Sequence, residues 1–143
     1  MVKKVENTDL GAAAALAALL WPEHTPQELA ALLIQQKANG AQCFVLYQQD
    51  EPAGFAQCSL RRDYVEGTAS SPVGYLEGLF VKEEYRRRGV AKALLAACEQ
   101  WAREQGCTEF ASDCELANCA SQRFHRSAGF REANRIVCFA KKL

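Results

Sequence analysis

The sequence predicts an α/β fold in which a mixed β-sheet carries helices on its faces. Segments with the apolar pattern of strands alternate with helical segments, in the order strand, two helices, three strands, helix, strand, helix, strand. The chain has 143 residues and contains no repeat, linker or low-complexity tract. Residues 1–143 are therefore expected to form a single domain.

The first half predicts one strand, two helices and a hairpin. Val2 to Glu6 is a short strand, and Asn7 or Thr8 caps an Ala-rich helix that runs to about Leu20. Thr25-Pro26-Gln27-Glu28 is a capping box that opens a second helix, which ends at Asn39-Gly40. Two strands follow, Cys43 to Gln48 and Ala53 to Leu60, joined by a tight turn.

The second half begins with a long polar loop from Arg61 to Pro72, and long ordered loops in compact domains are often functional. The later elements are predicted from their apolar spacing and from Gly or Asn at their ends: strand Val73 to Val81, helix Arg88-Gly89 to about Gln105, strand Thr108 to Ser112, helix Asn118 to Ser127, and one or two strands within Phe130 to Lys141.

Composition excludes several classes of protein. Lys and Arg balance Asp and Glu at 17 each, which argues against a nucleic-acid partner. The seven cysteines are odd in number and form no CxxC pair, so reduced thiols in the cytoplasm are the simpler interpretation. Cys107, Cys114, Cys119 and His125 fit no compact zinc knuckle, and we expect no metal.

The apolar run from Leu10 to Trp21 follows Lys3 and Lys4 and superficially resembles a signal peptide. Glu6 and Asp9 interrupt the approach to it, and the run is shorter than the ~20 residues that a membrane span needs. We therefore expect no membrane association.

An anion site is predicted where strand Val73 to Val81 leads into a loop with three arginines and a glycine. Unpaired N–H groups at a helix start, together with the helix dipole, favour a bound anion. Gly89 lets the backbone approach a phosphate closely, and Arg side chains add charge-assisted hydrogen bonds. The alternative is a solvated basic turn before an ordinary helix.

The pattern Arg86-x-x-Gly89-x-Ala91 after an apolar strand resembles the acetyl-CoA signature of the GCN5-related N-acetyltransferases (GNAT). The resemblance implies an acyl-CoA N-acyltransferase fold with a partly splayed sheet. It also implies a pyrophosphate cradled by Arg86, Arg87, Arg88, Gly89, Val90, Ala91 and Lys92. Backbone N–H groups at Leu79, Phe80 and Val81 would hold the pantetheine and the acetyl carbonyl, and Asn118 would bind further along the cofactor. The same strand amides would stabilise the oxyanion when an amine attacks.

A narrower resemblance covers nearly the whole chain. It rests on Trp21-Pro22-x-His24, Asp63-Tyr64-Val65-x-Gly67, Ser70 to Val73, Leu76-Glu77-Gly78, Arg88 to Lys92 and Ala111-Ser112-Asp113. These segments are similar to the aminoglycoside 6'-N-acetyltransferases, and most to their small chromosomal-type group. The similarity implies a substrate site lined by Trp21, His24, Tyr64, Glu77 and Asp113, and a homodimer.

The residue types suit that substrate independently. Carboxylates attract a polycationic sugar, and the faces of Trp21 and Tyr64 can stack on sugar rings and cations. Each residue also has a structural alternative: Glu77 could pair with a core arginine, Asp113 could cap a helix, Trp21 could fill the core, and His24 could belong to the neighbouring cap.

We expect direct acetyl transfer in a ternary complex, with Glu77 or Asp113 taking the proton of the amine. Many GNAT enzymes place a Tyr at the position of His125, and this Tyr protonates the departing thiolate; His125 could do the same or only pack near the cofactor. Asn134 stands where a relative carries a Glu that touches the drug. Two rivals stay open, a GNAT enzyme for another small amine, a polyamine or a protein N-terminus, and a module that senses acetyl-CoA without turnover.

Overall fold

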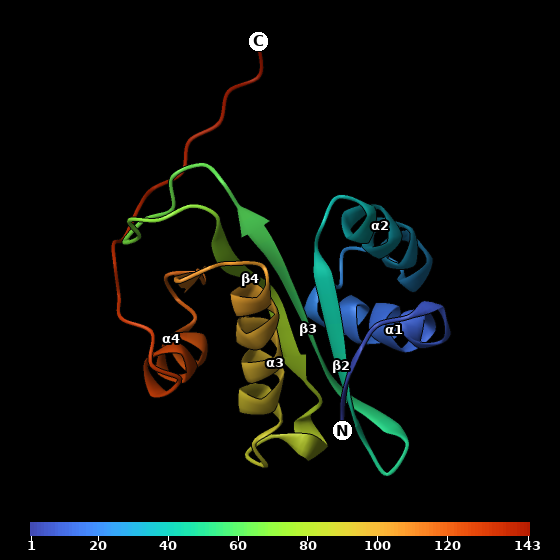
Figure 1. Cartoon of the computed structure of the whole chain (residues 1–143). Coiled ribbons are helices and arrows are strands. Elements are labelled where there is room, and N and C mark those ends of the chain that lie inside the picture. Colours follow the sequence, from blue (N-terminus) through green and yellow to red (C-terminus); the bar gives the residue numbers. More distant parts are fainter.

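The protein is described by a computed structural model over all residues 1–143 (Figure 1). Its five strands form one sheet in the order of the sequence, with the first four antiparallel and the last two parallel. The strands are β1 (Val2–Lys4), β2 (Gln42–Gln48), β3 (Glu51–Arg61), β4 (Val73–Val81) and β5 (Phe110–Ser112). The helices are α1 (Leu10–Leu20), α2 (Pro26–Ala38), α3 (Val90–Glu104) and α4 (Cys119–Ser127), with 3₁₀ turns at Asn7–Asp9 and Glu83–Tyr85.

The sheet carries a separate apolar core on each face. Helices α1 and α2 cover one face, where Leu16, Leu29 and Phe55 are buried (Figure 1). Helix α3 covers the other face through Leu94, Leu95 and Cys98, and α4 adds Phe124 to the edge of that core. Side chains alternate along a strand, so neighbouring residues of β2 and β3 supply the two cores in turn.

Local sequence signals explain where the elements begin. The Thr25 hydroxyl accepts the N–H of Glu28 at 3.1 Å and caps α2, as predicted. Gln49 and Asp50 both have positive φ, so they form the two-residue turn that matches the twist of the β2–β3 hairpin. The predicted Ala-rich helix starts later than its cap residues suggested, because Asn7–Asp9 form a 3₁₀ turn before α1.

Strand β4 is irregular at the centre of the sheet. Gln57 of β3 lies opposite Gly78 and Cys58 lies opposite Leu76, so Glu77 has no partner on β3 and forms a β-bulge. On the other side, β4 pairs with β5 only from Gly74 to Leu76. The predicted splay of the sheet is therefore present, because the edge of β4 beyond Leu76 has no strand beside it.

The prediction of one or two strands within Phe130 to Lys141 is wrong for this structure. After α4 the chain forms no regular secondary structure, and the end of the chain runs away from the body as an extended, exposed segment (Figure 1). We call residues 131–143 the C-terminal arm. Its apolar residues fit a strand, but a strand forms only beside another strand that completes its backbone hydrogen bonds.

The seven cysteines are all free thiols, and four of them (Cys43, Cys58, Cys98 and Cys107) are buried in the cores. Burial raises the pKa of the Cys43 thiol to about 12, so this group packs as a small apolar side chain. No helix has the length and apolarity that a membrane crossing requires.

Candidate active site

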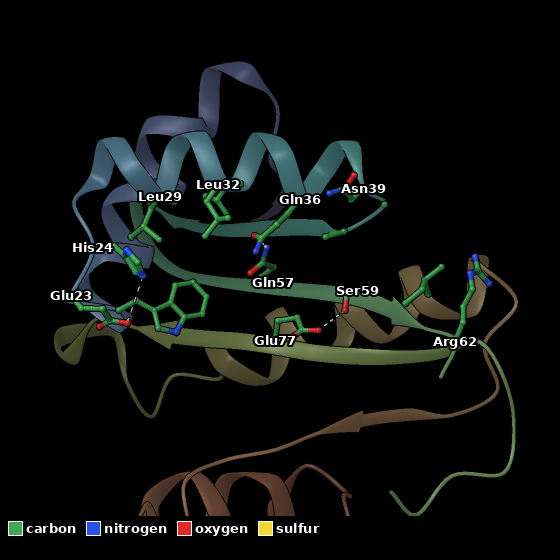
Figure 2. Close-up of a pocket in the computed structure, with 15 residues that line it drawn as sticks. Glu23, His24, Leu29, Leu32, Gln36, Asn39, Gln57, Ser59, Arg62 and Glu77 are labelled. Carbon is green, nitrogen blue, oxygen red and sulfur yellow. Dashed lines mark hydrogen bonds and ion pairs between the residues drawn. The ribbon is translucent and has the colours of Figure 1, made fainter. Parts of the chain in front are cut away.

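A cleft of about 630 Å³ lies between α2 and the face of the sheet formed by β3 and β4 (Figure 2). Its lining combines apolar side chains of α2, such as Leu32, with polar side chains that stand up from the two strands. Figure 2 shows Glu77 of β4 on the sheet side of this cleft, directed toward Ser59 of β3. We call this face of the sheet the acceptor face.

The bulge in β4 presents the Glu77 side chain on the acceptor face. Its Oε1 atom accepts the Ser59 hydroxyl at 2.6 Å. Arg61 donates to both carboxylate oxygens, from Nη2 to Oε1 at 3.1 Å and to Oε2 at 3.0 Å. Glu77 therefore does pair with an arginine, as its structural alternative expected. This arginine lies at the partly exposed end of β3 and not in the core.

Asp113 follows the last residue of β5 and is held differently. The hydroxyl of Tyr75, a residue of β4 that is paired with Ala111 of β5, donates to Oδ2 of Asp113. Burial, reinforced by this hydrogen bond and by the Asp113 charge, raises the pKa of Tyr75 above its ordinary range. Tyr75 therefore stays protonated and neutral beside Asp113.

The other predicted substrate residues are distributed unevenly. Trp21 and His24 line the cleft together with Glu77, whereas Tyr64 and Asp113 lie outside it. His24 also contacts Glu28 at 3.2 Å within the first turn of α2, as its structural alternative required. Trp21 packs edge-on against Phe55 and over Gly78, so it is both a core residue and part of the cleft wall.

Several polar residues of the cleft were missed by sequence reasoning. The side-chain amide of buried Gln57 donates to Oε1 of Gln36 on α2, and this pair spans the cleft (Figure 2). Ser59 and Arg62 also line it. A signal was present for Gln57, because a polar residue occupies a strand position that alternation would assign to the core.

The long loop that carries Tyr64 is held by the side chain of Glu109, the residue directly before β5. The Glu109 carboxylate accepts the N–H groups of Ala69 and Ser70 at 2.9 and 2.8 Å, and the Ser70 hydroxyl at 2.5 Å. These hydrogen bonds, that of the Ser70 hydroxyl foremost, hold the pKa of Glu109 below its usual value. Tyr64 itself is 75% exposed on this loop, where it is free to meet a ligand.

The predicted anion loop lies between β4 and α3. Arg87 and Gly89 have positive φ, and no side chain caps the first turn of α3. A Cβ added at Gly89 would meet no atom within 4 Å, so the space beside this residue is open. Arg86 donates from Nε to the Val81 carbonyl at 2.9 Å, which ties the loop to the end of β4. Backbone N–H groups at a helix start without a side-chain cap favour a bound anion, and the structure leaves this helix start uncapped.

The remaining predicted residues have clear local partners. Asn118 caps α4, since its side chain accepts the N–H of Ser121 at 3.1 Å. His125 contacts the Ser121 carbonyl through Nδ1 at 2.7 Å, so Nδ1 carries a proton. Its Nε2 lies 2.8 Å from the hydroxyl of Ser112, which also lies beside the Leu76 carbonyl at 3.4 Å. The Ser112 hydroxyl thus lies between His125 and Leu76, at the point where β4 and β5 separate.

Comparison with known proteins identifies the family. The model of the acetyltransferase (GNAT) family matches residues 13–130. The chain belongs to the GNAT family. The predicted family is therefore confirmed.

Two relatives show which group of GNAT proteins this chain resembles. It is 39% identical over 145 residues to an aminoglycoside N(6')-acetyltransferase type 1 of Acinetobacter baumannii, covering 99% of this chain and 98% of that protein. It is 42% identical over 148 residues to an enzyme of the same description from Klebsiella aerogenes, covering 100% and 97%. The narrower resemblance predicted from the sequence is confirmed at this level.

Solved structures agree with the predicted fold. The structure of AAC(6')-Iy in complex with a bisubstrate analogue, CoA-S-monomethyl-acetylneamine, superposes with a TM-score of 0.95 at 37% identity, covering 100% of this chain and 98% of that one. AAC(6')-Ih from Acinetobacter baumannii gives a TM-score of 0.92 at 36% identity, covering 100% and 98%. The mixed, splayed sheet with helices on both faces is thus the fold of these enzymes.

Proposed function

We propose that this GNAT enzyme transfers the acetyl group of acetyl-CoA to the 6'-amine of aminoglycosides. The observation that carries the proposal is the placement of two carboxylates, Glu77 and Asp113, beside the gap where β4 and β5 part. The anion loop follows the C-terminal end of β4, and Glu77 lies at the middle of that strand, so β4 links a phosphate site to an acidic acceptor face. The phosphate site suits a coenzyme A thioester as the acetyl donor, and the acidic face suits a cationic amine as the acceptor.

The donor side relies on backbone groups. The first turn of α3, from Val90 to Lys92, offers N–H groups to the pyrophosphate, while Arg87 and Arg88 supply charge. The free edge of β4 at Leu79 to Val81 offers further N–H groups to the pantetheine and the acetyl carbonyl. Fixed N–H dipoles aimed at a developing oxyanion lower the barrier of the attack. Acetyl-CoA itself supplies the activated thioester.

The acceptor side relies on carboxylates. An aminoglycoside amine is largely protonated near neutrality and must lose a proton before it attacks. Glu77 or Asp113 accepts that proton, directly or through a water molecule, and both lie on the acceptor face. Trp21 lines the cleft beside Glu77, and Tyr64 is exposed on the long loop, so both ring faces are available to stack on sugar rings.

On the leaving-group side, His125 and Ser112 form the available proton donor. Since Nδ1 of His125 donates to the Ser121 carbonyl, a proton leaves from Nε2 toward the Ser112 hydroxyl. The charged imidazole is then the form that protonates the thiolate, with Ser112 as the relay. A His125→Gln variant should lose turnover with little change in the KM for either substrate.

The direct test supplies the purified protein with acetyl-CoA and a panel of amines: kanamycin, tobramycin, spermidine and a peptide with a free N-terminus. Release of free thiol measures turnover, and NMR of the product gives the acetylated position. We expect turnover with the two drugs and acetylation at the 6' position. Turnover with spermidine or the peptide alone would show that the enzyme acts on one of the rival amines and not on aminoglycosides.

We propose further that the enzyme acts as a homodimer in the cytoplasm. The free thiols suit a reducing compartment. The C-terminal arm exposes Ile136, Val137 and Phe139 by 65%, 77% and 92%, which is unusual for a cluster of large apolar side chains in a folded chain. A second copy of the chain supplies the neighbouring strand that the arm lacks, and this contact removes the apolar residues from water.

A further inference from the structure

The two carboxylates of the acceptor face have different charge environments. Arg61 makes three hydrogen bonds to Glu77, from Nε and Nη2, and its guanidinium carbon lies 3.5 Å from the centre of the Tyr75 ring. A guanidinium that is both hydrogen-bonded at two nitrogens and stacked on an aromatic face is held firmly. The Glu77–Arg61 pair therefore has no net charge.

Asp113 is held by a hydroxyl and not by a cation. Its partner is the neutral hydroxyl of Tyr75, and Asp113 forms no ion pair. Its side chain is exposed at the end of β5. Of these two carboxylates, only Asp113 thus meets a cationic substrate without a cationic partner of its own; Glu23, which also lines the cleft, lies 4.0 Å from Nε2 of His24.

We infer that Arg61 gives the two carboxylates different roles: it neutralises and orients Glu77, so that of the two only Asp113 attracts the cationic substrate through an unpaired charge. This inference rests on the proposed function, because it assumes that both carboxylates face the amine. Arg61 is then a positioning and specificity residue for acetyl transfer.

The geometry also defines what Glu77 can still do. Each carboxylate oxygen has room for about two donors. Oε1 already receives donors from both Ser59 and Arg61, whereas Oε2 receives one donor from Arg61. Oε2 is therefore the atom left for a proton or an N–H group of the substrate, and Arg61 and Ser59 fix its direction.

The arrangement has an unusual mutational consequence. Removing the charge of Glu77 leaves Arg61 as an unpaired cation beside the cleft, and this cation repels a polycationic substrate. The loss in Glu77→Gln is then partly caused by Arg61, so removal of Arg61 as well should restore binding. A residue that only supported the fold could not give this result.

The test measures kcat and KM for tobramycin in the parent, Glu77→Gln, Arg61→Gln, the double variant and Asp113→Asn. In Arg61→Gln we expect kcat to fall, because Glu77 is no longer aimed, while KM does not rise. In the double variant we expect KM to be about three- to tenfold lower than in Glu77→Gln, the range for a partly exposed charged pair that is energetically coupled. Repeating the assays in increasing NaCl, we expect Asp113→Asn to lose more of the salt dependence of kcat/KM than the double variant does.

Arg62 provides the matched control, since it is the next residue, carries the same charge, lines the cleft and forms no ion pair. Adding Arg62→Gln to Glu77→Gln should lower KM less than adding Arg61→Gln. Equal restoration by the two arginine variants, or none by Arg61→Gln, overturns the inference. Parental KM in both Glu77→Gln and Asp113→Asn instead overturns the proposed acceptor site itself.

Discussion

Gly78 shows how a single missing side chain shapes the cleft. A Cβ added there would lie 2.7 Å from Cζ2 of Trp21 and 3.0 Å from Cδ2 of Leu20. Trp21 can therefore pack closely against β4 only because residue 78 is glycine. The position follows directly after the Glu77 bulge, so the tryptophan and the carboxylate are brought to the same cleft by adjacent residues.

Replacing Gly78 by Ala should displace Trp21 and cost about 1–3 kcal/mol of unfolding free energy, as overpacking of a tight site does. We also expect the KM for the drug to rise more than the KM for acetyl-CoA. Urea unfolding and steady-state kinetics measure the two effects. Gly11→Ala is the control, because its Cβ would meet nothing within 4 Å on α1. Equal behaviour of the two variants would contradict the packing argument.

The lowered pKa of Glu109 predicts that the folded protein loses stability in acid. Its folded-state pKa is lowered by the hydrogen bonds from Ser70 and Ala69, so the ionised form stabilises the folded protein. That stabilisation is complete above the ordinary glutamate pKa, about 4.3, and is lost as the pH falls through the lower folded-state value. The loop that carries Tyr64 should loosen over the same range.

In Glu109→Gln the difference in urea midpoint from the parent should therefore be largest at pH 7 and should shrink as the pH is lowered toward 3. At pH 7 the variant should also show a raised KM for the drug, with kcat nearly retained. Glu104→Gln, an exposed glutamate near the end of α3, serves as the control. A midpoint difference independent of pH would show that the charge of Glu109 does not fasten the loop.

Individual roles were the hardest part to predict from sequence. The sequence nominated Glu77, Asp113 and Trp21 by residue type and family resemblance, but it treated the two carboxylates alike. Their difference arises from Arg61 and Tyr75, which lie 16 and 38 positions away from their partners along the chain. Such pairings depend on strand register, and the bulge at Glu77 changes that register by one residue.

At the scale of elements, the loop between β4 and α3 is the feature that sequence described best. A glycine with positive φ, an arginine run and an uncapped helix start are all local, so a short window of sequence contains them. The bounds of β4 also matched the prediction residue for residue. Capping and turn chemistry act within a few residues, and this is why they could be recognised without the fold.

Substituting Gly89 by Asp should abolish binding of coenzyme A, because a side chain and a negative charge would enter the space in front of the first N–H groups of α3. Calorimetric titration with coenzyme A measures the loss. Gly106→Asp is the matched control at the other end of α3, since Gly106 also has positive φ and open space around it. Both variants carry the same backbone strain, so weak binding in both would refute a specific phosphate cradle.

At the scale of the whole molecule, the two-faced sheet was predictable and the C-terminal arm was not. Apolar periodicity gave strands and helices in an order that only a mixed sheet satisfies. The same periodicity predicted strands in Phe130 to Lys141, where the structure has none. Sequence patterning reports that a segment can be a strand, but the neighbouring strand must come from elsewhere, and for this arm the chain itself does not supply it.

The arm therefore carries the last prediction, that its apolar residues hold the dimer together. In the single chain Val137 and Phe139 are 77% and 92% exposed, so replacing both by Asp should change the stability of an isolated subunit by no more than about 0.5 kcal/mol. In a dimer the same change buries two charges in an apolar contact, which is far more costly. Light scattering after gel filtration should show a dimer for the parent and a monomer for the double variant. Leu143→Asp, at the exposed end of the arm, should remain dimeric.

The arm also lies beside the loop that carries Tyr64, because Nδ2 of Asn134 lies 3.5 Å from Oε2 of Glu66. The monomeric variant should therefore also show a raised KM for the drug. A parent protein that is monomeric at micromolar concentration would contradict the dimer and would leave the exposure of the arm without a physical cause.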